Sequence, residues 1–159
     1  MCNNGVMAEV EIAEFAGQLF FRLWRATHTR TAAALETIGL TPALFAVLNY
    51  LQANEGAIQQ QIGTAMGIDP STMVSLVDQL EGADLARRRP LPQDRRAREV
   101  LITAKGRRAL KRARELAAEV EDDVLQGLSA DERRELVALL RKAFAAAPQQ
   151  PLWSSAEGD

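Results

Sequence analysis

Apolar residues recur every three or four positions along the early part of the chain. The pattern runs from Ile12 to Ile38 and predicts one long helix, which Gly39 ends. Thr41 and Pro42 then supply a capping oxygen and a first helical residue that needs no amide hydrogen. They predict a second helix whose buried face carries Leu44, Phe45, Leu48 and Leu51.

Two further helices are predicted on either side of a glycine turn. Ile58, Ile62 and Ala65 indicate a short helix that stops at Gly67. The run from Asp69 to Thr72 combines capping side chains with a proline suited to an early helical position. It predicts a fourth helix that buries Met73, Val77 and Leu80 and exposes Thr72, Ser75, Asp78 and Gln79.

Beyond Gly82 the apolar period changes from helical to alternating. Leu85, Arg87 and Arg89 alternate with their neighbours, and Val100 and Ile102 do so again, which predicts a two-stranded hairpin. Pro90 and Pro92 are expected to interrupt the ladder and to leave a long solvated tip.

Two helices close the predicted fold. Thr103 caps a fifth helix that Gly127 ends, and Ser129 with Glu132 forms a capping box for a sixth helix that reaches Phe144. The segment from residue 148 onward has two prolines and no periodicity, so we expect a disordered tail. The expected fold class is all-α with a small β-hairpin.

Composition favours one soluble domain. The chain has 159 residues, of which 47% are hydrophobic and 25% charged. Cys2 is the only cysteine, so no intramolecular disulfide is available, and this usage fits a reducing cytoplasm. No apolar run approaches the roughly 20 residues of a membrane span, and no signal-peptide pattern is present at the start. We therefore expect a cytoplasmic protein without a membrane partner.

Charge is distributed unevenly, although the formal net charge is only -2. Between Asp84 and Arg114 twelve Lys and Arg stand against three acids, which makes this segment a cationic patch on an acidic body. A charge run is often only a solvated face, but solvated faces usually mix both signs. A stretch of one sign is the expected footprint on the phosphate backbone of DNA.

The predicted elements form a recognisable constellation. A short helix, a tight turn at Gly67 and a helix that opens on hydroxyl side chains make a helix-turn-helix, whose second helix lies in the major groove. The basic hairpin that follows is suited to the adjacent minor groove. The sequence lacks a phosphate-binding glycine loop, a nucleophile elbow and zinc-ligand spacing, so we expect neither an enzyme nor a cofactor.

Three stretches of the sequence are distinctive as written. They are LTPALFAVLNYL before the helix-turn-helix, DPSTMVSLVDQLEGADLARRR at the recognition helix and first wing strand, and PQDRRAREVLITAKG at the wing tip and return strand. They resemble the multiple antibiotic resistance regulator (MarR) family of bacterial transcription factors, from about Phe15 to Phe144. The resemblance implies a homodimeric repressor that leaves a palindromic operator when a small, often aromatic effector binds.

The resemblance also implies a division of the chain and a set of DNA contacts. Segment 1–38 is the N-terminal dimerisation helix, 39–103 the winged helix-turn-helix domain, 104–147 the C-terminal dimerisation helices and 148–159 the tail. The recognition helix, about 70–82, enters the major groove, and the wing, about 87–99, enters the minor groove. The expected DNA-binding residues are Ser71, Thr72, Ser75, Gln79, Arg87, Arg89, Asp94, Arg95, Arg96 and Arg98, with Asp94 bracing the wing arginines.

One departure from the family pattern lies on the recognition helix. Family members often carry arginines where this sequence has Ser75 and Gln79. Fewer bidentate guanine contacts are then available, so base readout is expected to depend on hydroxyl and amide groups, on water and on groove shape.

Aromatic residues on the first helix are candidates for an effector site. Phe20, Trp24 and His28 are suited to line such a cavity, although an aromatic core is the commoner explanation of this spacing. A lone histidine does not make a metal site.

Two alternatives remain open. One is a winged-helix module that binds an acidic protein partner. The other is a redox-responsive regulator that uses Cys2, although this thiol precedes the first helix and has no neighbouring base or cation.

Overall fold

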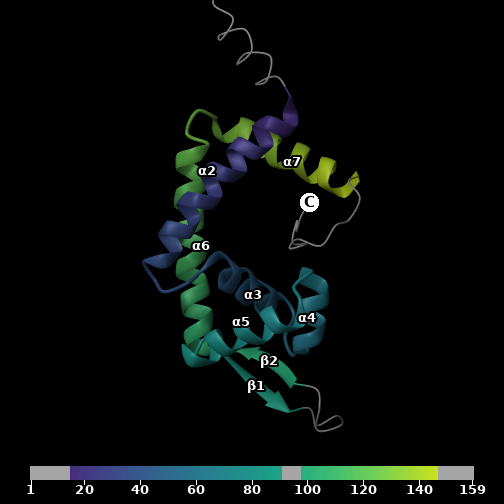
Figure 1. Ribbon diagram of the computed structural model, residues 1–159. Coiled ribbons are helices and arrows are strands. Elements are labelled where there is room, and N and C mark those ends of the chain that lie inside the picture. Colours follow the sequence, from purple (N-terminus) through teal and green to yellow (C-terminus); the bar gives the residue numbers. More distant parts are fainter. Residues whose placement is uncertain (1–14, 91–97, 147–159) are drawn as a thin grey trace, which may run out of the picture.

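The computed structural model describes residues 15–90 and 98–146 and contains a winged domain joined to long helices (Figure 1). Its helices are α2 (Ala16–Glu36), α3 (Pro42–Ala53), α4 (Gln59–Met66), α5 (Pro70–Gly82), α6 (Ala104–Val124) and α7 (Ala130–Ala146). The strands β1 (Ala86–Pro90) and β2 (Arg98–Ile102) form an antiparallel hairpin between α5 and α6. The predicted order of elements is confirmed. Across the described ranges, no helix combines the length and apolar character that a membrane crossing requires.

Side-chain caps fix the starts of three helices where the sequence predicts them. The hydroxyl oxygens of Thr41 and Thr103 each accept a hydrogen bond from the backbone amide three residues later, at 3.2 and 2.9 Å. The Glu132 carboxylate accepts from both the amide and the hydroxyl of Ser129, at 2.8 and 2.7 Å. Each bond satisfies a polar group that a helix end otherwise leaves unpaired.

The hydrophobic core lies in the winged half of the molecule, where α3, α4, α5 and the hairpin pack together. Leu35 at the end of α2 and Leu110 of α6 complete this core, so both long helices are anchored to it. Figure 1 shows α2 and α6 side by side, with α7 at the end of α6 farthest from the hairpin. Fully buried side chains include Leu48, Leu51, Ile62, Met73, Val77, Leu80 and Val100.

Two glycines set the close approaches that orient the winged domain. Gly67 ends α4 with a φ of 67°, a left-handed conformation that turns the chain tightly into α5. Gly106 lies against the chain just before β1, where an added Cβ would overlap the carbonyl oxygen of Leu85. The start of α6 is therefore held directly against the base of the hairpin.

The described ladder ends at Pro90, the first of the two prolines expected to interrupt it. Pro90 pairs with Arg98 as the last residue of β1. At that position its missing amide hydrogen removes no bond from the interior of the ladder. Pro92 and the predicted helix start at Ile12 lie outside the described residues, as do Cys2 and the expected disordered tail 148–159.

The aromatic residues of α2 do not form part of the core of this chain. Phe20 is 51% exposed and Trp24 is 58% exposed, so the interpretation as ordinary aromatic core is wrong. Helix α7 contains no buried residue, and its Phe144 is 63% exposed. Apolar residues at helical spacing normally form a face that packs against other apolar side chains. On α2 and α7 this face is exposed to solvent within the described part of the chain.

Candidate nucleic-acid interface

Asp69 closes the turn of the helix-turn-helix and caps α5. Its Oδ1 atom accepts hydrogen bonds from the amides of Ser71 and Thr72, both at 3.0 Å, and from the Ser71 hydroxyl at 2.5 Å. The bonds from Ser71 and then from Thr72 hold the pKa of the Asp69 carboxyl far below its usual value. The ionised carboxylate thus fixes the first turn of α5, and it accepts the one hydrogen bond that the Ser71 hydroxyl can donate.

The solvent face of α5 is polar and carries short side chains. Thr72, Ser75 and Gln79 are exposed, as predicted, and Gln79 Nε2 donates to Ser75 Oγ at 3.3 Å. Ser71 is exposed as well, but its hydroxyl already donates to Asp69, so only its acceptor capacity remains. Hydroxyl and amide groups on one helix face are suited to the edges of base pairs.

Arg88 joins α4, α5 and β1 through a single guanidinium group. Its Nη1 donates to Asp78 Oδ1 and Glu81 Oε2, both at 2.5 Å. Its Nε donates to Gln59 Oε1 at 2.8 Å. The side chain is only 19% exposed, so these charge-assisted bonds are partly shielded from water. The recognition helix and the first wing strand are therefore braced against each other.

Glu99 is a buried carboxylate near the loop end of the hairpin, 6% exposed and directly across the ladder from Arg89. Arg89 Nε donates to Glu99 Oε1. This hydrogen bond, together with the charge of Glu99, raises the pKa of Arg89. The Arg89 side chain is 60% exposed, so the ion pair orients a guanidinium that is open to solvent.

The other predicted wing residues divide into two groups. Arg87 and Arg98 are exposed on the hairpin, and Arg98 lies at the end of the ladder next to segment 91–97. Asp94, Arg95 and Arg96 lie outside the described residues, so their places at the DNA stay predictions.

Several cations of α6 bind partners within the chain. Lys105 Nζ donates to the carbonyl oxygen of Ala83 at 2.8 Å, and Arg107 Nη1 donates to Gln52 Oε1 at 3.3 Å. Arg112 pairs with Glu115 at 3.3 Å on the same helix. The first two contacts attach α6 to the winged domain, and the third lies within α6.

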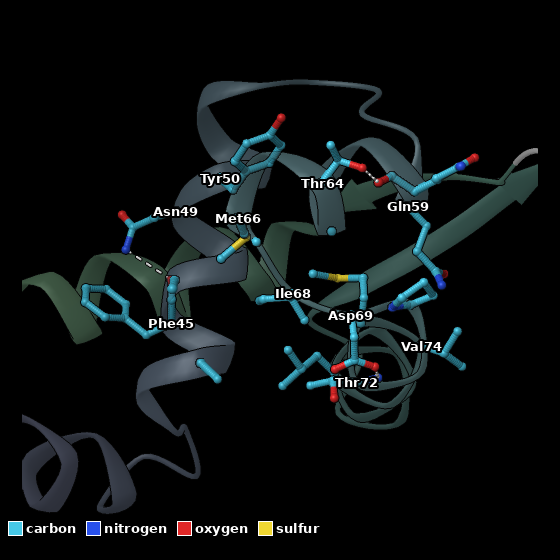
Figure 2. Close-up of a pocket in the computed structure, with 18 of the residues that line it drawn as sticks. Phe45, Asn49, Tyr50, Gln59, Thr64, Met66, Ile68, Asp69, Thr72 and Val74 are labelled. Atoms are coloured by element: carbon cyan, nitrogen blue, oxygen red, sulfur yellow. Dashed lines mark hydrogen bonds between the residues drawn. The ribbon is translucent and has the colours of Figure 1, made fainter. Parts of the chain in front are cut away.

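A broad open cavity of about 1580 Å³ lies beside the first turn of α5. Trp24 and His28 of α2 line it, and their rings stack with 5.0 Å between centroids and 19° between planes. Phe20 is not among the described residues that line it. Figure 2 shows other lining side chains, among them Tyr50 of α3 and Thr72 of α5. The cavity and the candidate DNA face thus share the amino-terminal turn of α5.

Three residues of this arrangement are absent from the sequence prediction. Gln59, Arg88 and Glu99 act through partners that only the tertiary structure brings near. No local pattern marks Glu99, because alternation with the buried Val100 predicts that it is exposed, whereas both residues are buried.

Known proteins share both the sequence and the fold. The sequence profile of the MarR family matches residues 38–97. A protein of Thauera aromatica assigned to transcriptional regulation of the hcr operon is 33% identical over 145 residues, which cover 89% of this chain and 87% of that protein.

Two solved structures extend the comparison. The transcriptional repressor CouR, solved bound to a 23-mer DNA duplex, is 33% identical and superposes with a TM-score of 0.75 over 91% of this chain and 99% of that chain. The PcaV transcriptional regulator from Streptomyces coelicolor, solved in complex with its natural ligand, is 30% identical, with a TM-score of 0.65 over 86% of this chain and 96% of that chain. With a curated relative at this identity over most of both lengths, the chain belongs to the MarR family of transcriptional regulators.

Proposed function

We propose that this chain acts in the cytoplasm as a homodimeric repressor that binds a palindromic stretch of double-stranded DNA. A small effector bound in the cavity releases it. The observation that carries the proposal is the Arg88 brace, because it holds the recognition helix and the first wing strand as one rigid unit. A rigid unit enters two neighbouring grooves in a single register.

In this proposal α5 lies in the major groove and the wing, about 87–99, lies in the minor groove. Thr72, Ser75 and Gln79 face the base edges, and Ser71 faces them as an acceptor. Arg95 and Arg96 enter the minor groove with Asp94 as their brace. Arg87, Arg89 and Arg98 contact phosphates, which position the protein without reading sequence.

Dimerisation is supported by the uncovered apolar face. Phe15, directly before α2, and large apolar residues of α2 and α7 are 40 to 71% exposed in the single chain; those on the helices include Leu19, Phe20, Leu139 and Phe144. Faces of this kind mark protein interfaces, since apolar surface gains free energy when it leaves water. Segments 1–38 and 104–147 therefore form the dimerisation part around the winged domain 39–103.

Two-fold symmetry of the dimer dictates the form of the operator. Two copies of α5 related by a two-fold axis read two half-sites that are inverted copies of each other, about one helical turn apart. The DNA-bound structure of CouR and the ligand-bound structure of PcaV support the two halves of the proposal, operator binding and effector binding.

Selection of bound duplexes from a random DNA pool at near-physiological salt tests the function. We expect an enriched two-fold symmetric motif that the dimer prefers over random duplex by roughly a thousandfold or more. Recovery of unenriched DNA would overturn the proposal. It would favour instead a winged-helix module whose basic surface binds an acidic protein.

A further inference from the structure

The chemistry of the cavity wall restricts the class of molecule that the cavity accepts. Its aromatic lining consists of Trp24, His28, Phe45 and Tyr50. Trp24 is stacked on His28 and is still 58% exposed, so one face of this ring pair is open to an occupant. Flat aromatic ligands gain both apolar burial and ring stacking on such a wall.

No lysine or arginine is among the described residues that line the cavity, and Asp69 is its only carboxylate. Apart from the imidazole of His28, the other polar lining groups are amides and hydroxyls: Asn49, Tyr50, Asn54, Gln59, Gln60, Thr64 and Thr72. The terminal segments 1–14 and 147–159 contain no lysine or arginine either.

Two arginines bind lining residues from outside the cavity. Arg88 donates to Gln59, but it is already paired with two carboxylates of α5. Arg114 Nε donates to Asn49 Oδ1 at 2.9 Å, and Asn49 Nδ2 in turn donates to the carbonyl oxygen of Phe45 at 3.0 Å. The charge of Arg88 is thus neutralised by Asp78 and Glu81. Arg114 is separated from the cavity by the Asn49 side chain, whose oxygen and nitrogen are both already hydrogen-bonded.

The amino terminus of α5 does not provide an anion-binding site in place of a lysine or arginine. A free helix terminus attracts an anion through its unpaired amides. Here the Asp69 carboxylate already accepts from the amides of Ser71 and Thr72. An anionic occupant would lose its hydration and would also meet this like charge.

We infer that the effector of this chain is an aromatic molecule without a negative charge, such as a phenol, an aryl ester or an aryl amide, and not an aromatic carboxylate. That the bound molecule acts as an effector rests on the proposed function. The charge preference itself is a property of the cavity and is measurable without DNA.

Matched pairs of probes test the inference on the full-length dimer. Methyl 4-hydroxybenzoate is compared with 4-hydroxybenzoate, and 2-naphthol with 2-naphthoate, at pH about 7.5. The first readout is direct binding, by calorimetry and by the shift in melting temperature. We expect the neutral member of each pair to bind at least about tenfold more tightly, because the carboxylate loses its hydration without gaining a lysine or arginine partner. Equal or tighter binding of the carboxylates overturns the inference, and so does a failure of both classes to bind.

Variants assign the binding to this cavity. Trp24→Ala should weaken binding of the neutral probes at least about fivefold, whereas Thr29→Ala, at an exposed position of the same helix that does not line the cavity, should not. Carboxylate binding that disappears in Arg114→Gln would show that this arginine enters the cavity, and would overturn the inference.

The second readout is release of a selected operator duplex by the same probes. A dimer that binds no duplex selectively contradicts the proposed function, while the direct binding measurement still decides the charge preference. Preferential binding of the neutral probes without release of the duplex contradicts their role as effectors.

Discussion

Arg88 Nε lies 2.8 Å from Gln59 Oε1 and donates a hydrogen bond to it. Gln59 begins α4 and lines the cavity, whereas Arg88 belongs to the first wing strand. Because the same guanidinium binds Asp78 and Glu81, the cavity wall, the recognition helix and the wing share one hydrogen-bonded residue. This is a direct physical link between the place where an effector would bind and the elements that read DNA.

Replacement of Arg88 by glutamine should destabilise the winged domain. We expect the free energy of unfolding to fall by about 2 kcal/mol, because two carboxylates lose a charged donor in a partly buried site. Urea denaturation at neutral pH measures the change. Arg87→Gln, on the exposed face of the same strand, is the matched control and should change stability by less than about 0.5 kcal/mol. Equal stabilities of the two variants would show that the brace contributes nothing.

Arg89→Ala should weaken binding to all DNA sequences alike. If Arg89 neutralises one phosphate, the slope of log affinity against log salt becomes shallower by about one unit. Titrations of the selected operator and of a random duplex at several salt concentrations measure that slope. Arg134→Ala provides the control, since Arg134 pairs with Asp131 on α7, far from the proposed interface. An unchanged slope for Arg89→Ala would remove this residue from the phosphate contacts.

Thr72→Ala should reduce sequence preference more than overall affinity. A lost base contact lowers the ratio of operator to random-duplex affinity by about fivefold, or ~1 kcal/mol, since base contacts specify and phosphate contacts position. Competition binding with the two duplexes measures the ratio. Thr64→Ala removes another exposed threonine hydroxyl from the cavity wall, on α4, and should leave the ratio unchanged. Equal losses on both duplexes would make Thr72 a positioning residue only.

Local signals made most of the fold predictable from the sequence. Thr103 and the Ser129–Glu132 pair cap their helices as predicted, because a capping side chain and the amide it binds are neighbours in the chain. Met73 and Val77 are buried for a similar reason, since their spacing puts them on one face of one helix. In each case, all the residues that determine the structure lie within a few positions of one another in the sequence.

The brace and the cavity depend on relationships that no local pattern contains. Arg88 and Gln59 are 29 positions apart, and they meet only because the hairpin folds back beside α4. The apolar spacing of α2 correctly predicts a helix, yet it does not say whether Phe20 packs within its own chain or on a partner. Site residues fixed by tertiary contacts therefore required the structure.

Asp69→Ala should destabilise the helix-turn-helix in a pH-dependent way. At neutral pH the variant leaves the amides of Ser71 and Thr72 without their acceptor, so we expect a lower urea midpoint than in the wild type. The pKa of Asp69 is depressed in the folded protein relative to its ordinary value of 3.8. The stabilisation is therefore complete above about pH 5 and is lost as pH falls through and below about pH 4 towards the folded pKa.

Urea midpoints of wild type and Asp69→Ala between about pH 3 and pH 7 measure this dependence. The gap between them should stay constant from pH 7 to about pH 5 and narrow below about pH 4. Asp69→Asn is the matched control, because asparagine is a good N-cap without a titratable group, and its advantage over alanine should not change with pH. A gap between wild type and Asp69→Ala as wide at pH 3 as at pH 7 would contradict a carboxylate cap. The first turn of α5, which borders both the cavity and the proposed DNA face, would then be held by contacts other than the ionised Asp69 side chain.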